Sequence, residues 1–414
     1  MEKLKKVVPS QRFLETSSIA ILLFLPWLDR GLATSLPLIF VWATLALSYN
    51  IILGLAGIPS FGHAIPFGVG AFTTALMLKT GMPYFLTVVL AGILAGLTYV
   101  AMGLPAYRVR GLYYGILTLA IAEAVRSAIE SYARTTVAIT IGTIPEMVDI
   151  TGLILYLALY TLFLALTLLT GIANVKATRR KNLKIAKTIF LTALLCLLAI
   201  GTFKAYKESL DFLTQVGQGL AYVKVVRFLY PVNLYLVTLL TLYISYLLIK
   251  RITMSPLGSV WVAVRENPLR ASVLGYNVFA HQLAAFLASG FFAGISGGIY
   301  VAVIPTVMPD VFATDKTFIA LTGVIIGGLG TILGPVIGGM ITGFLRDYLS
   351  GLSPLLIGFG WISLQQAQLL PSFALGIIYI IVVLALPYGI WGTWLLKGWK
   401  VKRKMEKLLG FETS

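Results

Sequence analysis

The chain has 414 residues, of which 58% are hydrophobic and only 11% are charged, and its mean hydropathy is +0.93. A soluble domain of this size does not tolerate such a composition, so the sequence indicates a polytopic membrane protein. The net charge of +17 does not indicate nucleic-acid binding, because the basic residues fall in short loops between apolar runs, as membrane orientation requires. The single cysteine, Cys196, excludes an intrachain disulfide.

Apolar runs of roughly 17 to 25 residues predict transmembrane helices. The first run is interpreted as a retained span, because no small-residue cleavage pattern follows it. We therefore expect an all-α polytopic membrane protein with about 10–12 transmembrane helices, some of them short or broken. The candidate spans are 17–32, 35–54, 62–79, 83–104, 112–129, 152–172, 187–203, 232–250, 282–304, 316–328, 332–349 and 371–389.

The basic loops predict the orientation of the spans. With the amino terminus inside, alternation places five basic clusters on the cytoplasmic side, at 3–12, 108–110, 176–187, 250–270 and 397–407. This parity requires the region 316–349 to form two short helices broken at Gly327 to Gly330, since one long helix would put the basic carboxyl terminus outside. Non-helical backbone at membrane depth must be buried or line a watery cavity. We therefore expect this break to face a pore or a partner subunit, and both termini to be cytoplasmic.

A polar loop leads into an apolar run over residues 255–301. Asn267 before Pro268 places an N-cap in front of a proline at the first helical position, and Gly275 suits a left-handed C-cap. Ser255 before Pro256 predicts a second start of the same kind. The loop is therefore expected to hold a short capped helix of about two turns, suited to transmitting force between two spans. The alternative is a surface helix that merely connects them.

The stretch from Gly54 to Gly81 is rich in helix breakers. Five glycines between Gly54 and Gly70, together with Pro59 and Pro66, predict a kinked or partly unwound segment. His63 adds a polar side chain at a depth where lipid offers no partner. Two interpretations stay open for it: a residue of a translocation path, or a packed histidine whose ring nitrogens bond to neighbouring backbone or hydroxyl groups.

Glycines spaced four apart recur in the predicted spans. Small residues at this spacing let helices approach closely in lipid. Close packing inside one subunit is the interpretation that we favour for most of them. They are Gly92/Gly96, Gly290/Gly294, Gly294/Gly298, Gly323/Gly327, Gly334/Gly338 and Gly339/Gly343.

Three stretches share motifs with one family. They are Arg265-Glu266-Asn267-Pro268 with the run to Val278, Ser60-Phe61-Gly62-His63 with Gly68 to Phe72, and Arg110-Gly111-Leu112-Tyr113-Tyr114. These stretches resemble the branched-chain amino acid ABC transporter permeases of the LivM type, and the resemblance covers roughly 35–130 and 232–390.

The resemblance implies an ABC importer permease fold with a cytoplasmic coupling loop at 251–281. The residues expected to couple this loop to separate ATPase subunits are Arg265, Glu266, Asn267, Pro268, Arg270, Val273 and Gly275. The translocation pathway is expected to include Ser60, Gly62, His63, Gly68 and Gly70 by resemblance, and Gly327, Gly328 and Gly330 from the predicted break.

The same resemblance implies the partners and the cargo. These are ATPase subunits that carry ATP and Mg²⁺, a second and non-identical permease subunit, an extracytoplasmic solute-binding protein, and a branched-chain or related small amino acid or a urea- or amide-like solute. The sequence has no G-x-x-x-x-G-K-[ST] phosphate loop, so ATP is not expected to bind to this chain. It also has no His/Cys/carboxylate cluster at metal spacing and no D-x-x-D acidic pair, so neither a cofactor nor enzyme activity is expected in it.

Residues 1–414 are expected to form one permease domain. Within it, 150–230 is predicted to be an insertion with two extra spans, and 397–414 a basic cytoplasmic tail. The main alternative function is an ion-coupled secondary transporter of a small polar solute, which calls for two matching halves and for intramembrane ionisable groups. The sequence offers the pair Glu123 and Arg126 for the second requirement. A membrane enzyme acting on lipids is a further alternative, and it calls for clustered catalytic groups.

Overall fold

The structure is a computed structural model that describes residues 30–107, 109, 111–133, 139–140, 220–358, 373–374, 376–381, 384 and 389–393. The chain divides into two units, Met1–Leu36 with Thr143–Val237, and Pro37–Gly142 with Thr238–Ser414. The features below belong to the second unit. The predicted spans 152–172 and 187–203 and the basic tail 397–414 lie outside the described residues.

The described part of the chain is almost entirely helical, as the sequence predicts. One small departure is an antiparallel pair of two-residue strands, in which Ile139 lies opposite Val307 and Thr140 opposite Thr306. The elements are α2 (Arg30–Asn50), the π-helix η2 (Ile51–Leu55), α3 (Ala64–Lys79), α4 (Tyr84–Gly103), the 3₁₀-helix η3 (Leu104–Tyr107), α5 (Leu112–Ala133), β1 (Ile139–Thr140), α8 (Leu220–Thr253), α9 (Pro256–Glu266), α10 (Pro268–Val273), α11 (Val278–Val303), β2 (Thr306–Val307), the 3₁₀-helix η5 (Pro309–Phe312), α12 (Thr314–Gly327) and α13 (Leu333–Gly358).

Within the described residues, four helical segments are long and apolar enough to cross a membrane. One face of α4 carries exposed large apolar side chains, among them Phe85, Val89 and Leu97, which are about half exposed. Such a face suits contact with lipid. The four segments are Thr34–Leu55, Tyr84–Gly103, Asn233–Thr253 and Val278–Val303, and Ala64–Lys79 is a shorter apolar helix.

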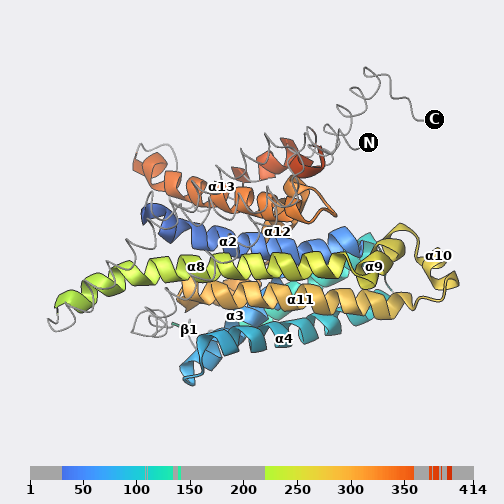
Figure 1. Cartoon of the computed structure of the whole chain (residues 1–414), viewed down its shortest axis with the longest axis horizontal. Helices are drawn as coiled ribbons and strands as arrows, with labels where there is room; N and C mark the ends of the chain where they lie inside the picture. Colours follow the sequence, from blue (N-terminus) through green and yellow to red (C-terminus); the bar gives the residue numbers. More distant parts are fainter. Residues whose placement is uncertain are drawn as a thin grey trace, which may run out of the picture. The chain divides into compact units, whose positions relative to one another are not determined.

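Glycines on α11 allow this helix to pack closely against α3 and α4 (Figure 1). A Cβ atom added at Gly290 would lie 2.6 Å from the Tyr99 side chain of α4. One added at Gly294 would collide with Ala95 of α4, and one at Gly297 with the Phe67 carbonyl of α3. Because these glycines contact neighbouring helices of the same chain, close packing inside one subunit is confirmed for this helix.

The helices α12 and α13 form the broken pair that the sequence predicts. α12 ends at Gly327, the backbone turns at Gly328 with φ +122°, and α13 begins at Leu333. A Cβ atom added at Gly327 would collide with the carbonyl of Gly334. The tight return of the chain therefore depends on glycine on both sides of the break.

Candidate functional site

The predicted short helix of the coupling loop is present as α10. The side chain of Asn267 accepts a hydrogen bond from the Arg270 backbone N–H at 3.0 Å, Pro268 occupies the first turn, and Gly275 has φ +88°. The cap predicted at Ser255 differs, because its hydroxyl donates to the Ile252 carbonyl at 2.6 Å and makes no cap bond to α9. A serine hydroxyl can bond back to a carbonyl of the preceding turn instead of capping the next helix, as it does here.

α10 presents apolar side chains to the outside. Leu269 is 73% exposed, Val273 86% and Leu274 73%. The helix projects past the ends of α9 and α11 (Figure 1). On its inner side, Ala271 packs with Val260, Val264 and Val278. A short helix held by one small residue, with an apolar outer face beside the exposed Arg270, has the character of a docking surface.

Arg265, which was predicted to belong to the same coupling set, points inward. Its Nη1 donates to the carbonyl oxygen of Gly54, and its Nη2 lies 2.9 Å from Glu266 Oε1. The aliphatic part of the side chain passes Gly57, where an added Cβ atom would collide with Arg265 Cγ. Gly57 has φ +71°, a conformation that favours glycine. The hydrogen bond to Gly54 thus distinguishes Arg265, whose side chain is 31% exposed, from the exposed Arg270.

The segment after α2 is interrupted as predicted: η2 covers Ile51–Leu55, and residues 56–63 are not helical. Asn50 connects this interruption to the break between α12 and α13. Its Oδ1 accepts from the Gly330 N–H at 3.0 Å, and its Nδ2 donates to the Thr331 carbonyl at 2.8 Å. Sequence reasoning missed Asn50, although a polar side chain in an apolar run beside predicted breaks was the available signal.

We call the set of Asn50, Gly54, Arg265, Gly330 and Thr331 the polar junction. Its hydrogen bonds join α9, the end of α2 and the α12–α13 break. It therefore includes one residue of the predicted coupling set, Arg265, whose side chain is 31% exposed. It also includes one residue of the predicted pathway set, the half-buried Gly330.

A cavity of about 220 Å³ lies beside the polar junction. Residues 56–59 line one side of it, and Val264, Arg265 and Pro268 line another. Tyr114 and Gln282 also contribute to the lining. The coupling loop and the interrupted segment are thus separated by open space over part of their common boundary.

The residues predicted from the amino-terminal stretch to line the pathway are all buried within the chain: Ser60, Gly62, His63, Gly68 and Gly70. The His63 Nε2 lies 2.9 Å from the Ser48 hydroxyl and the Nδ1 lies 3.3 Å from the Tyr99 hydroxyl. Both ring nitrogens therefore have partners, as a packed histidine requires. A role for His63 in a path stays a prediction.

Gly68 and Gly70 lie on different sides of α3, and each contacts another element. A Cβ atom added at Gly68 would collide with the ring of Phe312, and one added at Gly70 would collide with the backbone of Gly294. In the predicted break, Gly327 and Gly328 are buried and Gly330 is half-buried. Leu329, which lies between Gly328 and Gly330, is 46% exposed.

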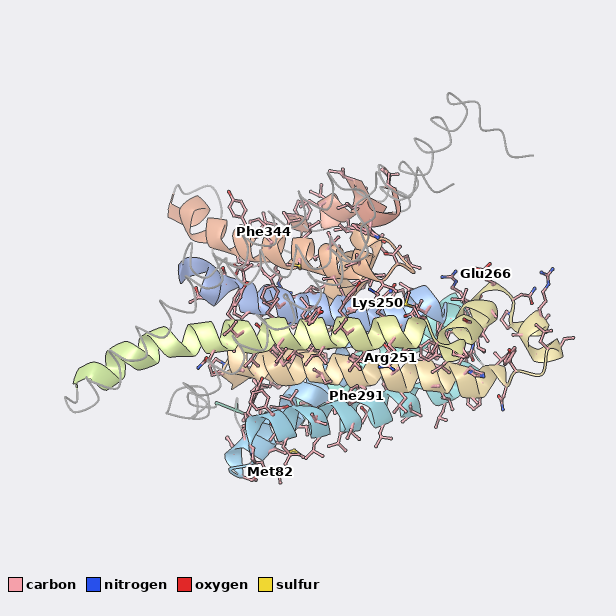
Figure 2. The ribbon with its side chains drawn as sticks, viewed as in Figure 1. Met82, Lys250, Arg251, Glu266, Phe291 and Phe344 are labelled. Atoms are coloured by element: carbon pink, nitrogen blue, oxygen red, sulfur yellow. The ribbon has the colours of Figure 1, made fainter. Side chains whose placement is uncertain are left out.

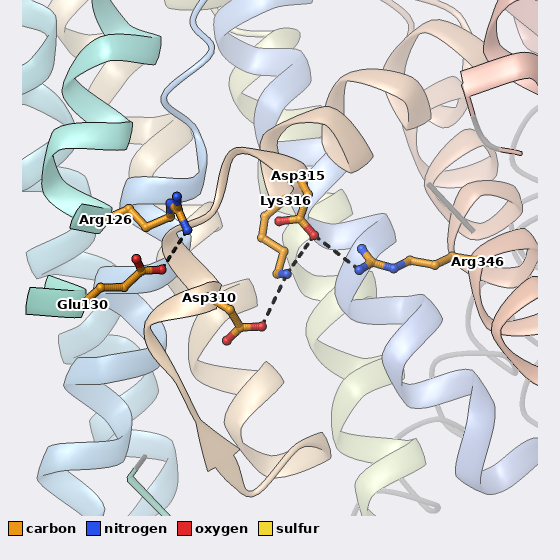
Figure 3. Close-up of polar contacts among 6 residues, drawn as sticks. All are labelled: Arg126, Glu130, Asp310, Asp315, Lys316 and Arg346. Atoms are coloured by element: carbon orange, nitrogen blue, oxygen red, sulfur yellow. Dashed lines mark hydrogen bonds and ion pairs between the residues drawn. The ribbon is translucent and has the colours of Figure 1, made fainter. Parts of the chain in front are cut away.

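A charged cluster, which the sequence did not predict, lies on α12, α13 and η5 (Figure 3). The Lys316 side chain is 6% exposed, and its Nζ lies 3.0 Å from Asp315 and 3.8 Å from Asp310. Arg346 of α13 lies 3.3 Å from the same Asp315 oxygen. The buried ammonium and the guanidinium thus share one carboxylate, which links the two helices of the broken pair.

The expected pair of Glu123 and Arg126 on α5 is present, and Arg126 also lies 2.7 Å from Glu130. The Arg126 side chain is 30% exposed. Among the residues that the structure describes, no group of three or more His, Cys, Asp or Glu side chains could hold a metal ion.

Comparison with known proteins identifies the family. Residues 31–386 match the family model described as branched-chain amino acid transport system / permease component. The chain belongs to this permease family. The resemblance drawn from the sequence motifs is thereby confirmed, as is the interpretation of the chain as a polytopic membrane protein.

Individual relatives are moderately similar to this permease. It is 26% identical over 304 residues to the high-affinity branched-chain amino acid transport system permease protein LivM of Escherichia coli, over 73% of this chain and 60% of the relative. It is 26% identical over 348 residues to the probable branched-chain amino acid transport permease protein LivH of Methanocaldococcus jannaschii, over 81% of this chain and 95% of the relative. The chain spans about 60% of the length of LivM. No solved structure matches it.

Proposed function

We propose that this chain is the membrane-spanning permease subunit of an ATP-binding cassette importer for branched-chain or related small amino acids. The observation that carries the proposal is the exposed apolar face of α10, with Leu269, Val273 and Leu274, in a chain that belongs to the permease family. The helix that carries this face is capped by Asn267, and Ala271 packs it against α9 and Val278. A partner is needed to cover an apolar face of this kind.

The proposed partner is an ATPase subunit. The sequence has no phosphate loop of its own, so ATP-driven transport requires energy from another chain. We propose that residues 251–281 form the coupling loop and that α10 seats in an apolar groove of the ATPase, with Arg270 at its rim. Glu266, at the end of α9, lies at the same end of the chain's second unit as Lys250 and Arg251 (Figure 2). This basic end is the proposed cytoplasmic side.

The other subunits are proposed by analogy with the relatives. A second and non-identical permease subunit, which the family resemblance implies, completes the proposed complex. An extracytoplasmic binding protein would deliver the solute to the far side. Residues 150–230 are proposed to be an insertion and 397–414 a basic cytoplasmic tail.

The proposed mechanism is alternating access around the two interruptions. Broken helices expose backbone N–H and C=O groups, which can bind the carboxylate and ammonium of an amino acid without charged side chains. The proposed pathway therefore follows residues 56–70 and 327–330. Ser60, His63 and Gly70 are buried in this conformation. The solute can therefore reach them only if α3 moves relative to its neighbours.

Copurification tests the proposal. We expect the full complex, extracted in mild detergent, to contain an ATPase subunit whose hydrolysis is stimulated by the solute and its binding protein. Replacing Arg270 and Val273 together by Glu should remove the ATPase from the complex while the permease still inserts. Met82→Glu is the matched control, because Met82 is 42% exposed at the opposite end from Glu266 (Figure 2). Equal ATPase recovery with all three proteins would contradict the proposal.

An ion-coupled secondary transporter is the second candidate. One observation favours it: Lys316 is nearly buried between Asp310 and Asp315, and buried ionisable groups mark ion pathways in such transporters. Uptake into vesicles that contain the purified chain, an ion gradient and no ATPase would select this alternative.

A further inference from the structure

The Gly54 carbonyl cannot be satisfied by the helix to which it belongs. The Ile58 N–H, its partner in a regular α-helix, donates instead to the Ile52 carbonyl at 2.9 Å. The next residue, Pro59, has no N–H to offer. A buried carbonyl requires a donor, and Arg265 Nη1 supplies it from α9. The interruption after α2 therefore creates an acceptor that a residue of the coupling loop fills.

Two glycines, Gly57 and Gly330, lie against the side chain of Arg265. Arg265 passes Gly57, and a Cβ atom added at Gly330 would lie 3.2 Å from Arg265 Nη1. Both glycines have positive φ, +71° and +77°. Any side chain at either position would be strained and would crowd the arginine. The junction thus has room for the fork of the guanidinium, one arm on Gly54 and the other on Glu266.

The cavity makes this contact mechanically important. Open space of about 220 Å³ lies between part of residues 56–59 and the α9–α10 loop, and the Arg265 side chain lies against Gly57 beside it. A movement of α10 reaches α9 through the packing of Ala271 on Val260 and Val264. It can be passed on through Arg265, whose hydrogen bond reaches Gly54, and from there through Asn50 to Gly330 and Thr331.

We propose that Arg265 is a positioning residue for transport that links the docking helix to both helix interruptions, and that it does not contact the ATPase. The inference rests on the proposed function, because it requires a partner that displaces α10. In this arrangement Arg270 and its apolar neighbours bind the partner, whereas Arg265 moves the ends of α2 and α12. Docking and transmission are thus assigned to two arginines five residues apart.

Two variants of the reconstituted complex separate these roles. For Arg265→Gln, we expect ATPase recovery equal to the wild type, but uptake per ATP hydrolysed lower by about tenfold, within the range of measured coupling effects. For Arg270→Gln, we expect less ATPase in the complex and unchanged uptake per ATP in what remains. Arg265→Lys should restore part of the coupling, since an ammonium can donate to Gly54 but cannot form the fork.

Two outcomes of that experiment would overturn the inference. One is wild-type uptake per ATP in Arg265→Gln, and the other is loss of the ATPase from Arg265→Gln to the same extent as from Arg270→Gln. Neither is the same as failure of the proposed function, which would show as the absence of any ATPase from the wild-type complex.

Hydrogen exchange on the purified chain tests the link without a partner. In Arg265→Gln, we expect faster exchange of backbone amides in residues 51–58 and 328–333, where the junction holds both interruptions. Arg270→Gln is the matched control and should leave both segments as in the wild type. Equal exchange in the two variants would mean that Arg265 does not hold the interruptions together, and would overturn the inference.

Discussion

The ammonium of Lys316 lies 3.0 Å from the carboxylate of Asp315, and only 6% of the lysine side chain is exposed. The same carboxylate oxygen lies 3.3 Å from Arg346 on the facing helix. A buried charge requires a partner, since an ion that has lost its water regains the energy only from an opposite charge or hydrogen bonds. Asp315 therefore stabilises a cation on each helix of the broken pair.

Asp315→Asn removes that shared charge with little change of shape. We expect it to lower the free energy of unfolding by about 2 kcal/mol, less than a fully buried pair would lose because Asp315 is 41% exposed. Equilibrium unfolding in mixed micelles measures the change. Asp310→Asn is the matched control, since Asp310 is 61% exposed and 3.8 Å from Lys316, and its cost should be well below 1 kcal/mol, about that of a surface pair. Equal costs would refute the shared role of Asp315.

Gly70→Ala should destabilise the chain although alanine is the better helix former. The added methyl group collides with the Gly294 backbone, and overpacking of this kind costs about 1–3 kcal/mol. Gly70→Leu should abolish accumulation of the folded protein, and with it transport.

Gly351→Ala serves as the control for Gly70→Ala. Gly351 lies in α13 with nothing within 4 Å of an added Cβ atom, so this change should stabilise the chain slightly through helix propensity. Both are measured by the same unfolding transition. Loss of stability by the same amount at the two sites would argue against the close contact between α3 and α11.

Asn267→Ala tests whether the cap holds α10 in shape. The lost hydrogen bond to the Arg270 N–H should destabilise the helix by about 1 kcal/mol and so raise amide exchange across residues 268–274. Ser255→Ala makes a matched comparison, because Ser255 precedes α9 in the same way but gives it no cap bond. Exchange in α9 should therefore not change. If Ser255→Ala raises amide exchange in α9 as much as Asn267→Ala raises it in α10, the cap bond of Asn267 does not account for the order of α10.

The sequence predicted local structure well, because local structure here depends on neighbours in the chain. Glycine and proline positions predicted the interruption after α2, and the alternation of the basic loops together with Gly327 to Gly330 predicted the break between α12 and α13. Asn267, Pro268 and Gly275 predicted the ends of α10. The caps and breaks are short-range effects of backbone sterics and orphan hydrogen-bonding groups.

The contacts that join these elements were not predictable in this way. Arg265 and Gly54 are 211 residues apart, and Asn50 and Thr331 are 281 apart. Whether the Gly54 carbonyl is left unsatisfied depends on how the chain leaves the π-helix, which the sequence does not state. For the same reason the sequence grouped Arg265 with Arg270, although the two side chains point to different surroundings.

Asn50 provides the last prediction, since its side chain bonds from the end of α2 to two residues of the break between α12 and α13. Asn50→Ala leaves the Gly330 N–H and the Thr331 carbonyl without these partners, which should cost about 1–3 kcal/mol of stability. Thr44→Ala is the control on the same helix, because the buried Thr44 hydroxyl donates to the Phe40 carbonyl one turn back in α2, away from the break. We expect faster amide exchange in residues 328–333 for Asn50→Ala and not for Thr44→Ala. Because the coupling of α9 to this break passes through Asn50, Asn50→Ala should also lower uptake per ATP as Arg265→Gln does. If Asn50→Ala shows wild-type uptake per ATP together with faster amide exchange in residues 328–333, the two interruptions act independently in transport.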